Sequence, residues 1–214
     1  MFNPLKAEVV GRFTAVESFF KAAHGLKGNE AQTARGLAFV QMYAAYEYTV
    51  TTVVQRAIDS LISHNHATNK LAPSLFALFL DPELTSLRDC PMKSEWERRL
   101  DLFKRVFDDA PAIVSNTVFP KDGTHFRSSQ LQMIFRVLGI NRTPAQRHRH
   151  LHRINEVVEA RNAIAHGRET ADGVGRRFTR AEVLHAIQQM KSVCLFLISA
   201  IQNYCSDPNK HCRK

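Results

Sequence analysis

The sequence predicts an all-α protein, a single compact bundle of about five to seven helices over residues 1–214. Apolar residues recur at helical spacing along most of the chain, and no stretch alternates apolar and polar residues as a strand does. No repeat, low-complexity segment or linker divides the chain. Its length is sufficient to bury a substantial core within one domain.

Two long helices are expected in the first half of the chain, at residues 5–24 and 29–64. Glycines end the first helix, and apolar residues line one face of the second. After them, residues 71–80 and 94–107 fit shorter helices. Ser94 is the expected N-cap of the latter because acidic residues occupy the first turn that follows it.

In the second half, residues 111–123 are expected to form a loop and residues 128–139 a short helix that a glycine closes. Thr143 and Pro144 form a typical helix start, a capping residue followed by proline at the first helical position. The penultimate helix is therefore predicted to begin there and to end near Gly167.

Three glycines in residues 167–177 indicate a flexible connection. The final helix is expected to begin at Thr179, where Glu182 three residues later completes a capping box. This helix should end near Tyr204, and a frayed tail is expected from about residue 206.

The formal net charge of +9 and the pI of about 9.7 favour a polyanionic partner such as nucleic acid, although many basic proteins bind none. The N-terminal residues lack the pattern of a secretion signal. The longest apolar run, residues 193–201, is only about half of a membrane span. A cytoplasmic protein with no membrane partner is therefore expected.

The cysteines and histidines give little indication of a metal. Four scattered cysteines do not fit a disulfide framework in a chain of this size. Cys205 and Cys212 with His211 form a weak metal-ligand pattern, and reduced buried or tail thiols are the alternative interpretation. His148 and His152 are four residues apart, but no third ligand is apparent nearby. No metal and no cofactor are expected.

Residues 161–167, RNAIAHG, bring an arginine, an amide and a histidine together near a helix end. Arginine can hold a phosphate bidentately and histidine transfers protons near neutral pH, so the stretch suggests chemistry on a phosphodiester. On a helical wheel Arg161 falls in the middle of an apolar arc, while Asn162 and His166 share its edge. Such an arginine pairs with a buried partner, lies in a water-filled pocket, or extends its charged end to solvent from the apolar face.

The pattern Arg161-Asn162-x-x-x-His166 on the penultimate long helix resembles the signature of the HEPN superfamily of small helical domains. Residues 43–47, YAAYE, are similar to a patch that faces the active site in some prokaryotic members. For Glu47 the alternative is a solvated or ion-paired helix residue. Many HEPN domains are metal-independent endoribonucleases of toxin–antitoxin, abortive-infection and RNA-processing systems.

The resemblance implies a homodimer in which two copies of the motif form one composite active site. His166 would transfer protons, Arg161 would stabilise charge at the phosphorus, and Asn162 would orient the histidine or hold a phosphate oxygen. Glu47 is a further catalytic candidate. The expected products carry 2′,3′-cyclic phosphate and 5′-hydroxyl ends. Arg168 stands where members that an antitoxin of the nucleotidyltransferase type modifies often carry a tyrosine, so this mode of control is not expected.

Basic residues around the motif are candidates for contact with RNA phosphates, and such contacts would make binding salt-sensitive. These candidates are Arg147, Arg149, Arg153 and Arg168, and a solvated basic face is the alternative. The leading hypothesis is an endoribonuclease that serves as a toxin or anti-phage defence effector, with an antitoxin or regulatory protein as a possible further partner. Two alternatives remain: a non-catalytic HEPN module that binds RNA, a nucleotide or a protein, and a structural role for Arg161 in a dimer ion-pair network.

Overall fold

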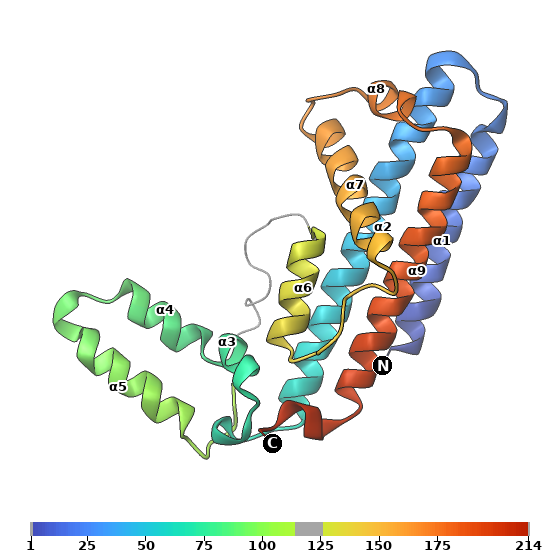
Figure 1. Ribbon diagram of the computed structural model, residues 1–214. Helices are drawn as coiled ribbons and strands as arrows, with labels where there is room; N and C mark the ends of the chain where they lie inside the picture. The colour runs from blue at the N-terminus through green and yellow to red at the C-terminus, as the bar shows by residue number, and fades with distance from the viewer. Residues whose placement is uncertain (1, 114–125, 214) are drawn as a thin grey trace. The chain divides into compact units, whose positions relative to one another are not determined.

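The computed structural model describes residues 2–113 and 126–213, and within these ranges the prediction of an all-α fold is confirmed. Only two isolated β-bridges interrupt the helices and turns of the described residues. The predicted loop at residues 111–123 lies largely outside them. The helices shown in Figure 1 are α1 (Asn3–Ala22), α2 (Gly28–Ser63), α3 (Phe76–Phe79), α4 (Asp81–Asp89), α5 (Glu95–Val106), α6 (Ser128–Val137), α7 (His148–Ala165), α8 (Ala171–Arg176) and α9 (Arg180–Cys205).

Contacts within the chain define two compact units, and α2, α6 and α9 contribute residues to both. The described residues of the first unit are 2–53, 126–131 and 143–200. Those of the second unit are 54–113, 132–142 and 201–213. The prediction that the whole chain is one domain stays a prediction.

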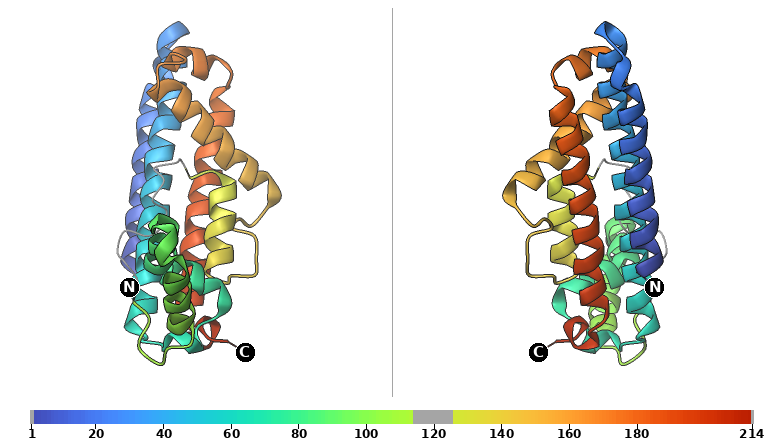
Figure 2. Two further views of the ribbon diagram at one scale, coloured as in Figure 1. Left: turned by 90° about the vertical axis from the view of Figure 1, so that its left-hand side faces the viewer. Right: turned by 90° about the vertical axis from the view of Figure 1, so that its right-hand side faces the viewer.

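The first unit is built on α1 and on the parts of α2 and α9 that belong to it, with α7 inclined across α2 and α9 (Figures 1 and 2). The helical spacing of apolar residues explains this packing, because residues three or four apart share one face of a helix. On α1 the stripe that the spacing predicts is buried: Leu5, Val9, Phe13, Val16 and Phe20.

Two glycines bring the backbones of α2 and α8 into direct contact. A Cβ atom on Gly175 would lie 1.9 Å from the Gln32 carbonyl oxygen, and one on Gly36 would lie 2.0 Å from the Ala171 carbonyl oxygen. Arg35 Nε also donates a hydrogen bond of 2.9 Å to the Gly175 carbonyl oxygen. Glycine is therefore required at both positions by close packing.

Two sequence predictions about this unit are wrong. The penultimate helix begins at His148 and not at Thr143, because Pro144 and the following alanine are buried in a turn and Thr143 Oγ1 donates to a carbonyl oxygen inside that turn. Residues 167–177, expected as a flexible connection, contain α8. Thr170 caps this helix by accepting a hydrogen bond from Gly173 N at 3.3 Å.

The capping box at the start of α9 is confirmed. Glu182 Oε2 accepts hydrogen bonds from both the backbone nitrogen and Oγ1 of Thr179, at 2.6 and 2.8 Å. Among the described residues α9 is the one helix long and apolar enough to cross a membrane by length and composition. Because 56% of its most apolar window is buried inside the structure, this signal is also what a core helix produces.

In the second unit, α4 and α5 pack side by side (Figure 1). The sequence analysis missed α4, and the expected N-cap of α5, Ser94, makes no capping hydrogen bond through its side chain. An apolar stripe on α5 and its C-cap residue faces solvent, with exposed fractions of 77% for Trp96, 54% for Leu100, 61% for Phe103 and 68% for the C-cap Phe107.

Residues 206–213 pack within the second unit, which differs from the prediction of a frayed tail from about residue 206. Pro208–His211 form a 3₁₀-helix whose last residue is fully buried. The Ala72 nitrogen donates to the His211 carbonyl oxygen at 2.7 Å, and the Arg213 nitrogen donates to the Lys70 carbonyl oxygen at 2.9 Å. Backbone hydrogen bonds therefore fix this segment against the turns that follow α2.

Candidate functional site

The RNAIAHG stretch forms the C-terminal end of α7. His166 is the C-cap residue, and its backbone nitrogen donates to the Asn162 carbonyl oxygen at 3.1 Å. Gly167 follows with φ of +65°, a left-handed conformation that glycine adopts without steric cost. The prediction that this glycine ends the helix is therefore confirmed, and the turn places His166 at the point where the chain leaves α7.

Arg161 lies half-buried where α7 faces α2. Its guanidinium carbon is 4.6 Å from the centre of the Tyr43 ring, a cation–π contact of the kind that stabilises by about 1 kcal/mol or more. Its Nη1 donates a hydrogen bond of 3.1 Å to Asn162 Oδ1, and Asn162 is itself buried. Arg161 thus occupies the middle of an apolar face because it covers an aromatic ring.

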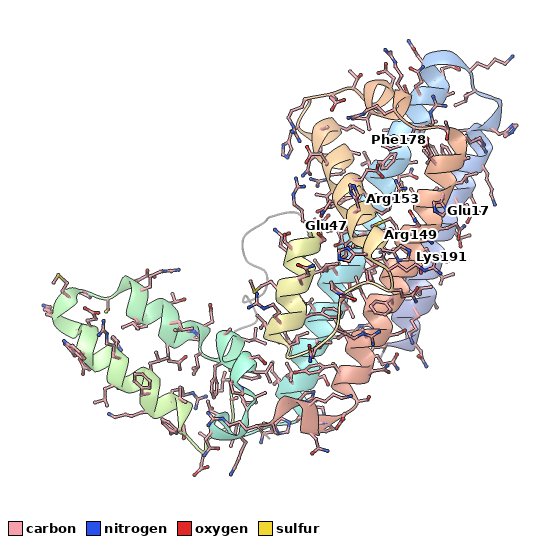
Figure 3. The ribbon with its side chains drawn as sticks, viewed as in Figure 1. Glu17, Glu47, Arg149, Arg153, Phe178 and Lys191 are labelled. Carbon is pink, nitrogen blue, oxygen red and sulfur yellow. The ribbon has the colours of Figure 1, made fainter. Side chains whose placement is uncertain are left out.

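The second stretch that resembles the HEPN pattern meets the first at this contact. Tyr43 OH donates a hydrogen bond of 3.0 Å to Glu47 Oε1. Burial and the neighbouring Glu47 carboxylate raise the pKa of Tyr43 well above its ordinary value, so the phenol keeps its proton. Glu47 is only partly buried, and Figure 3 labels its position on α2. The structure therefore connects Asn162, Arg161, Tyr43 and Glu47 in one continuous array.

His166 is exposed at the end of α7. It lies four residues after Asn162 and thus on the same side of the helix, roughly 40° away, whereas Arg161 precedes Asn162 by roughly 100°. Asn162 consequently lies between the two around the helix axis. The end of α7 thus carries an accessible imidazole and, roughly 140° away around the helix axis, a guanidinium that an aromatic ring and an amide hold in place.

Comparison with known protein families shows to which family the chain belongs. A family model described as RiboL-PSP-HEPN matches residues 8–206. The chain belongs to the RiboL-PSP-HEPN family. Comparison with curated proteins and with solved structures gave no match. The family confirms the superfamily that the sequence resembled, and it indicates an RNase-type or RNA-related module.

A pocket of about 510 Å³ adjoins the motif of this HEPN protein, lined by α7 and by residues on either side of α8. Glu159 lies at its wall and pairs with Arg127 at 2.7 Å and with Arg168 at 3.0 Å. Both arginines lower the pKa of Glu159, which stays ionised. Arg168, a predicted RNA contact, is therefore held by a carboxylate. The remaining lining residues are His152, Asn155, Glu156, Ala160, Ala163, Glu169, Arg177 and Phe178.

The basic run at the start of α7 separates into exposed and buried members. Arg147 and Arg149 are exposed, and Figure 3 labels Arg149 and Arg153 along α7. Arg153 is largely buried, donates to Gln189 Oε1 at 2.8 Å and pairs with Glu156. Burial lowers the pKa of Arg153. Of the predicted RNA contacts on this helix, Arg147 and Arg149 have the freest access to solvent.

A second and smaller pocket, about 270 Å³, brings in residues that the sequence analysis missed. His185 and Gln189 of α9 line it beside Arg149 and His152 of α7. The spacing of residues within α7 could not have indicated them, because they come from the following long helix. This pocket adds an imidazole and an amide to the basic surface of the HEPN protein.

Proposed function

We propose that this HEPN protein is a metal-independent endoribonuclease that acts as a homodimer with a composite active site. The 2′-hydroxyl of RNA attacks the adjacent phosphate, which leaves 2′,3′-cyclic phosphate and 5′-hydroxyl ends. The observation that carries the proposal is the array at the end of α7, where Arg161 stacks on Tyr43 and donates to Asn162, and the exposed His166 follows Asn162 by one helical turn. We further propose a cytoplasmic role as a toxin or anti-phage defence effector, controlled by an antitoxin or another regulatory protein.

In this mechanism Arg161 supplies fixed positive charge to the phosphorane-like transition state. A guanidinium already held by a ring and an amide needs little reorganisation when the charge develops, which is the condition for efficient electrostatic stabilisation. Asn162 accepts a hydrogen bond from Arg161, so we assign it the positioning of the guanidinium. Glu47 acts through Tyr43, because its carboxylate accepts a hydrogen bond from the Tyr43 hydroxyl.

His166 is the proposed proton-transfer residue because an imidazole can act as base or acid near neutral pH. Cleavage requires both roles, one at the 2′-hydroxyl and one at the 5′-oxygen. One protomer offers a single histidine in the motif, so the second role is assigned to His166 of a partner subunit. Arg147 and Arg149 would bind flanking phosphates.

The test is incubation of total RNA with purified protein in EDTA, followed by identification of the fragment ends. His166→Ala and Arg161→Ala should each lower the cleavage rate by about 100-fold or more, the usual effect of removing a positioned acid–base group or charge. Circular dichroism in the same buffer checks that each variant retains its helices. Retained cleavage in both variants would contradict the proposal.

Two matched substitutions serve as controls. Arg12 also stacks on a tyrosine, with its guanidinium carbon 3.6 Å from the Tyr48 ring centre, but it lies on α1. His24 is an exposed histidine far from the motif in sequence. Arg12→Ala and His24→Ala should leave the cleavage rate unchanged. Saturable RNA binding without product at any protein concentration would favour the non-catalytic module.

A further inference from the structure

The apolar stripe of α5 (Trp96, Leu100, Phe103 and Phe107) belongs to a pair of helices that bury little of their own surface. The structure describes every residue of α4 and α5, and none of them is buried. α5 faces α4 through another side, where Arg105 is 18% exposed and lies 3.8 Å from Glu83. The four members of the stripe fall within about 60° of one another and at least about 140° from Arg105 around the helix axis. The stripe therefore points away from α4.

The spacing of the stripe is that of a coiled-coil seam. Successive members are four, three and four residues apart, so they alternate between the d and a positions of a heptad repeat, beginning with Trp96 at d. This spacing is the same in both directions along the helix. Two antiparallel copies of α5 therefore place Trp96 against the partner's Phe107 and Leu100 against the partner's Phe103. The stripe is complementary to itself, as a two-fold symmetric interface requires.

The charges beside the stripe favour the antiparallel orientation. Glu97 and Lys104 occupy the two e positions, on the same side of the seam. In an antiparallel pair the e positions face each other, so Glu97 of each copy meets Lys104 of the other. In a parallel pair Lys104 meets Arg99, at a g position, and like charges repel. Lys104 lies 4.0 Å from Asp101 of its own helix and is 67% exposed, which leaves its ammonium group accessible to a partner.

The area and the composition of the surface fit a weak protein partner. An aromatic side chain buries about 150–250 Å², so with their exposed fractions the four members offer about 500 Å² per copy. Two copies bury about 1,000 Å² in total, the lower limit of a specific interface. The four basic and three acidic residues of α5 nearly cancel, whereas helices that bind membrane surfaces usually carry a strongly basic polar face.

We propose that α5 binds α5 of a second copy of this chain in antiparallel orientation. The pairing covers the four exposed apolar side chains and forms two ion pairs between Glu97 and Lys104 at the rim. Because the interface is small, the pair forms reversibly at micromolar concentration. The proposal does not rest on the proposed nuclease, because α5 belongs to the second unit and the motif of Arg161 and His166 belongs to the first.

Trp96 is the only tryptophan of the chain, so its fluorescence reports on α5 alone. When the full-length protein is concentrated from roughly 0.1 to 100 µM, the emission of Trp96 should shift to shorter wavelength and acrylamide should quench it less, because the ring leaves water. Emission that does not change with concentration would overturn the proposal. A shift caused by vesicles of phosphatidylserine and phosphatidylcholine, and not by protein concentration, would assign the stripe to a membrane surface instead.

Loss of one seam residue tests which surface produces the shift. Phe103→Gln should weaken the pairing by about 100-fold or more, because each copy loses one buried aromatic side chain. Met133→Gln replaces a half-exposed apolar residue of α6 and is the matched control, with the midpoint of the wild type expected. Circular dichroism checks that both variants retain their helices. A wild-type midpoint in Phe103→Gln, or equal loss in Met133→Gln, would refute pairing through the stripe.

Charge reversal tests the orientation. Lys104→Glu and Glu97→Lys each bring like charges together in an antiparallel pair and should each weaken it by about 10-fold, less at high salt. When the two variants are mixed in equal amounts, both ion pairs form again between unlike chains, so the wild-type midpoint should return. Arg98→Glu makes the same change on the side away from the stripe and should have no effect. Parallel pairing predicts stronger association for Lys104→Glu, which would contradict the proposed orientation.

Discussion

Replacement of glycine by alanine should have opposite effects on stability at Gly175, in the contact between α2 and α8, and at Gly11 of α1. At Gly175 an added Cβ meets the Gln32 carbonyl oxygen at 1.9 Å and the Gly36 nitrogen at 2.7 Å. At Gly11, inside α1, an added Cβ meets no atom within 4 Å. Gly175→Ala should therefore destabilise the protein, and Gly11→Ala should stabilise it.

The magnitudes follow from these distances. Ordinary contact begins near 3.4 Å, so Gly175→Ala forces the two backbones apart by about 1.5 Å. Overpacking costs about 1–3 kcal/mol, and we expect about 3 kcal/mol because backbone atoms cannot rotate away as a side chain can. Gly11→Ala should gain about 0.5–1 kcal/mol from helix propensity alone. For a chain of this size, each kcal/mol shifts Tm by about 2–4 °C.

Thermal unfolding followed by circular dichroism measures both effects. Gly175→Ala should lower Tm by about 6–12 °C and Gly11→Ala should raise it by about 1–4 °C. If the two units unfold in separate steps, only the step of the first unit should move, because both glycines belong to it. A Gly175→Ala variant as stable as the wild type would show that α8 does not rest on α2 through this glycine.

Two further predictions concern titratable groups. Burial lowers the pKa of His66, and lowers that of His211 to about 4. These histidines bind protons near pH 6.5 in the unfolded chain but not in the folded chain. The free energy of unfolding should therefore be highest above that pH and fall by about 3 kcal/mol toward pH 4. A free energy of unfolding, measured with urea, that does not change over this range would refute the prediction. Burial also raises the pKa of Cys194 to about 12 and that of Cys205 to about 11. Iodoacetamide at pH 8 should therefore leave both unmodified in the native protein while it labels Cys90, and mass spectrometry of the digest would reveal any exception.

Local signals in the sequence predicted the long helices well and the short segments poorly. The capping box of Thr179 and Glu182 was predicted correctly because its interactions span only three residues. Thr143 and Pro144 carried an equally typical start signal, but burial of the turn overrode it. The glycine-rich connection contains α8 because Gly175 serves close packing, which its sequence neighbours cannot reveal.

In the candidate site too, the sequence predicted local features better than contacts between distant segments. Arg161 lies half-buried among the buried residues of α7, as the helical wheel predicted, whereas Asn162, which the wheel placed at the edge of that face, is buried. The partner of Arg161, Tyr43, comes from a helix far earlier in the chain, and only the resemblance of the YAAYE stretch pointed toward it. The spacing of His64 and His66 could not predict that the ring of His211, from the C-terminal end of the chain, lies against them.

The apolar stripe of α5 has a practical consequence for any measurement of assembly. More than half of each of its four large side chains faces solvent, and adjacent exposed apolar groups of this size promote association that depends on concentration. A dimer detected at high concentration could therefore form through α5 and not through α7. Measuring the molecular mass of Leu100→Glu and His166→Ala over a dilution series separates these two modes of association. The charge that Leu100→Glu adds to α5 should abolish association through its apolar stripe, while a dimer that assembles the motif persists.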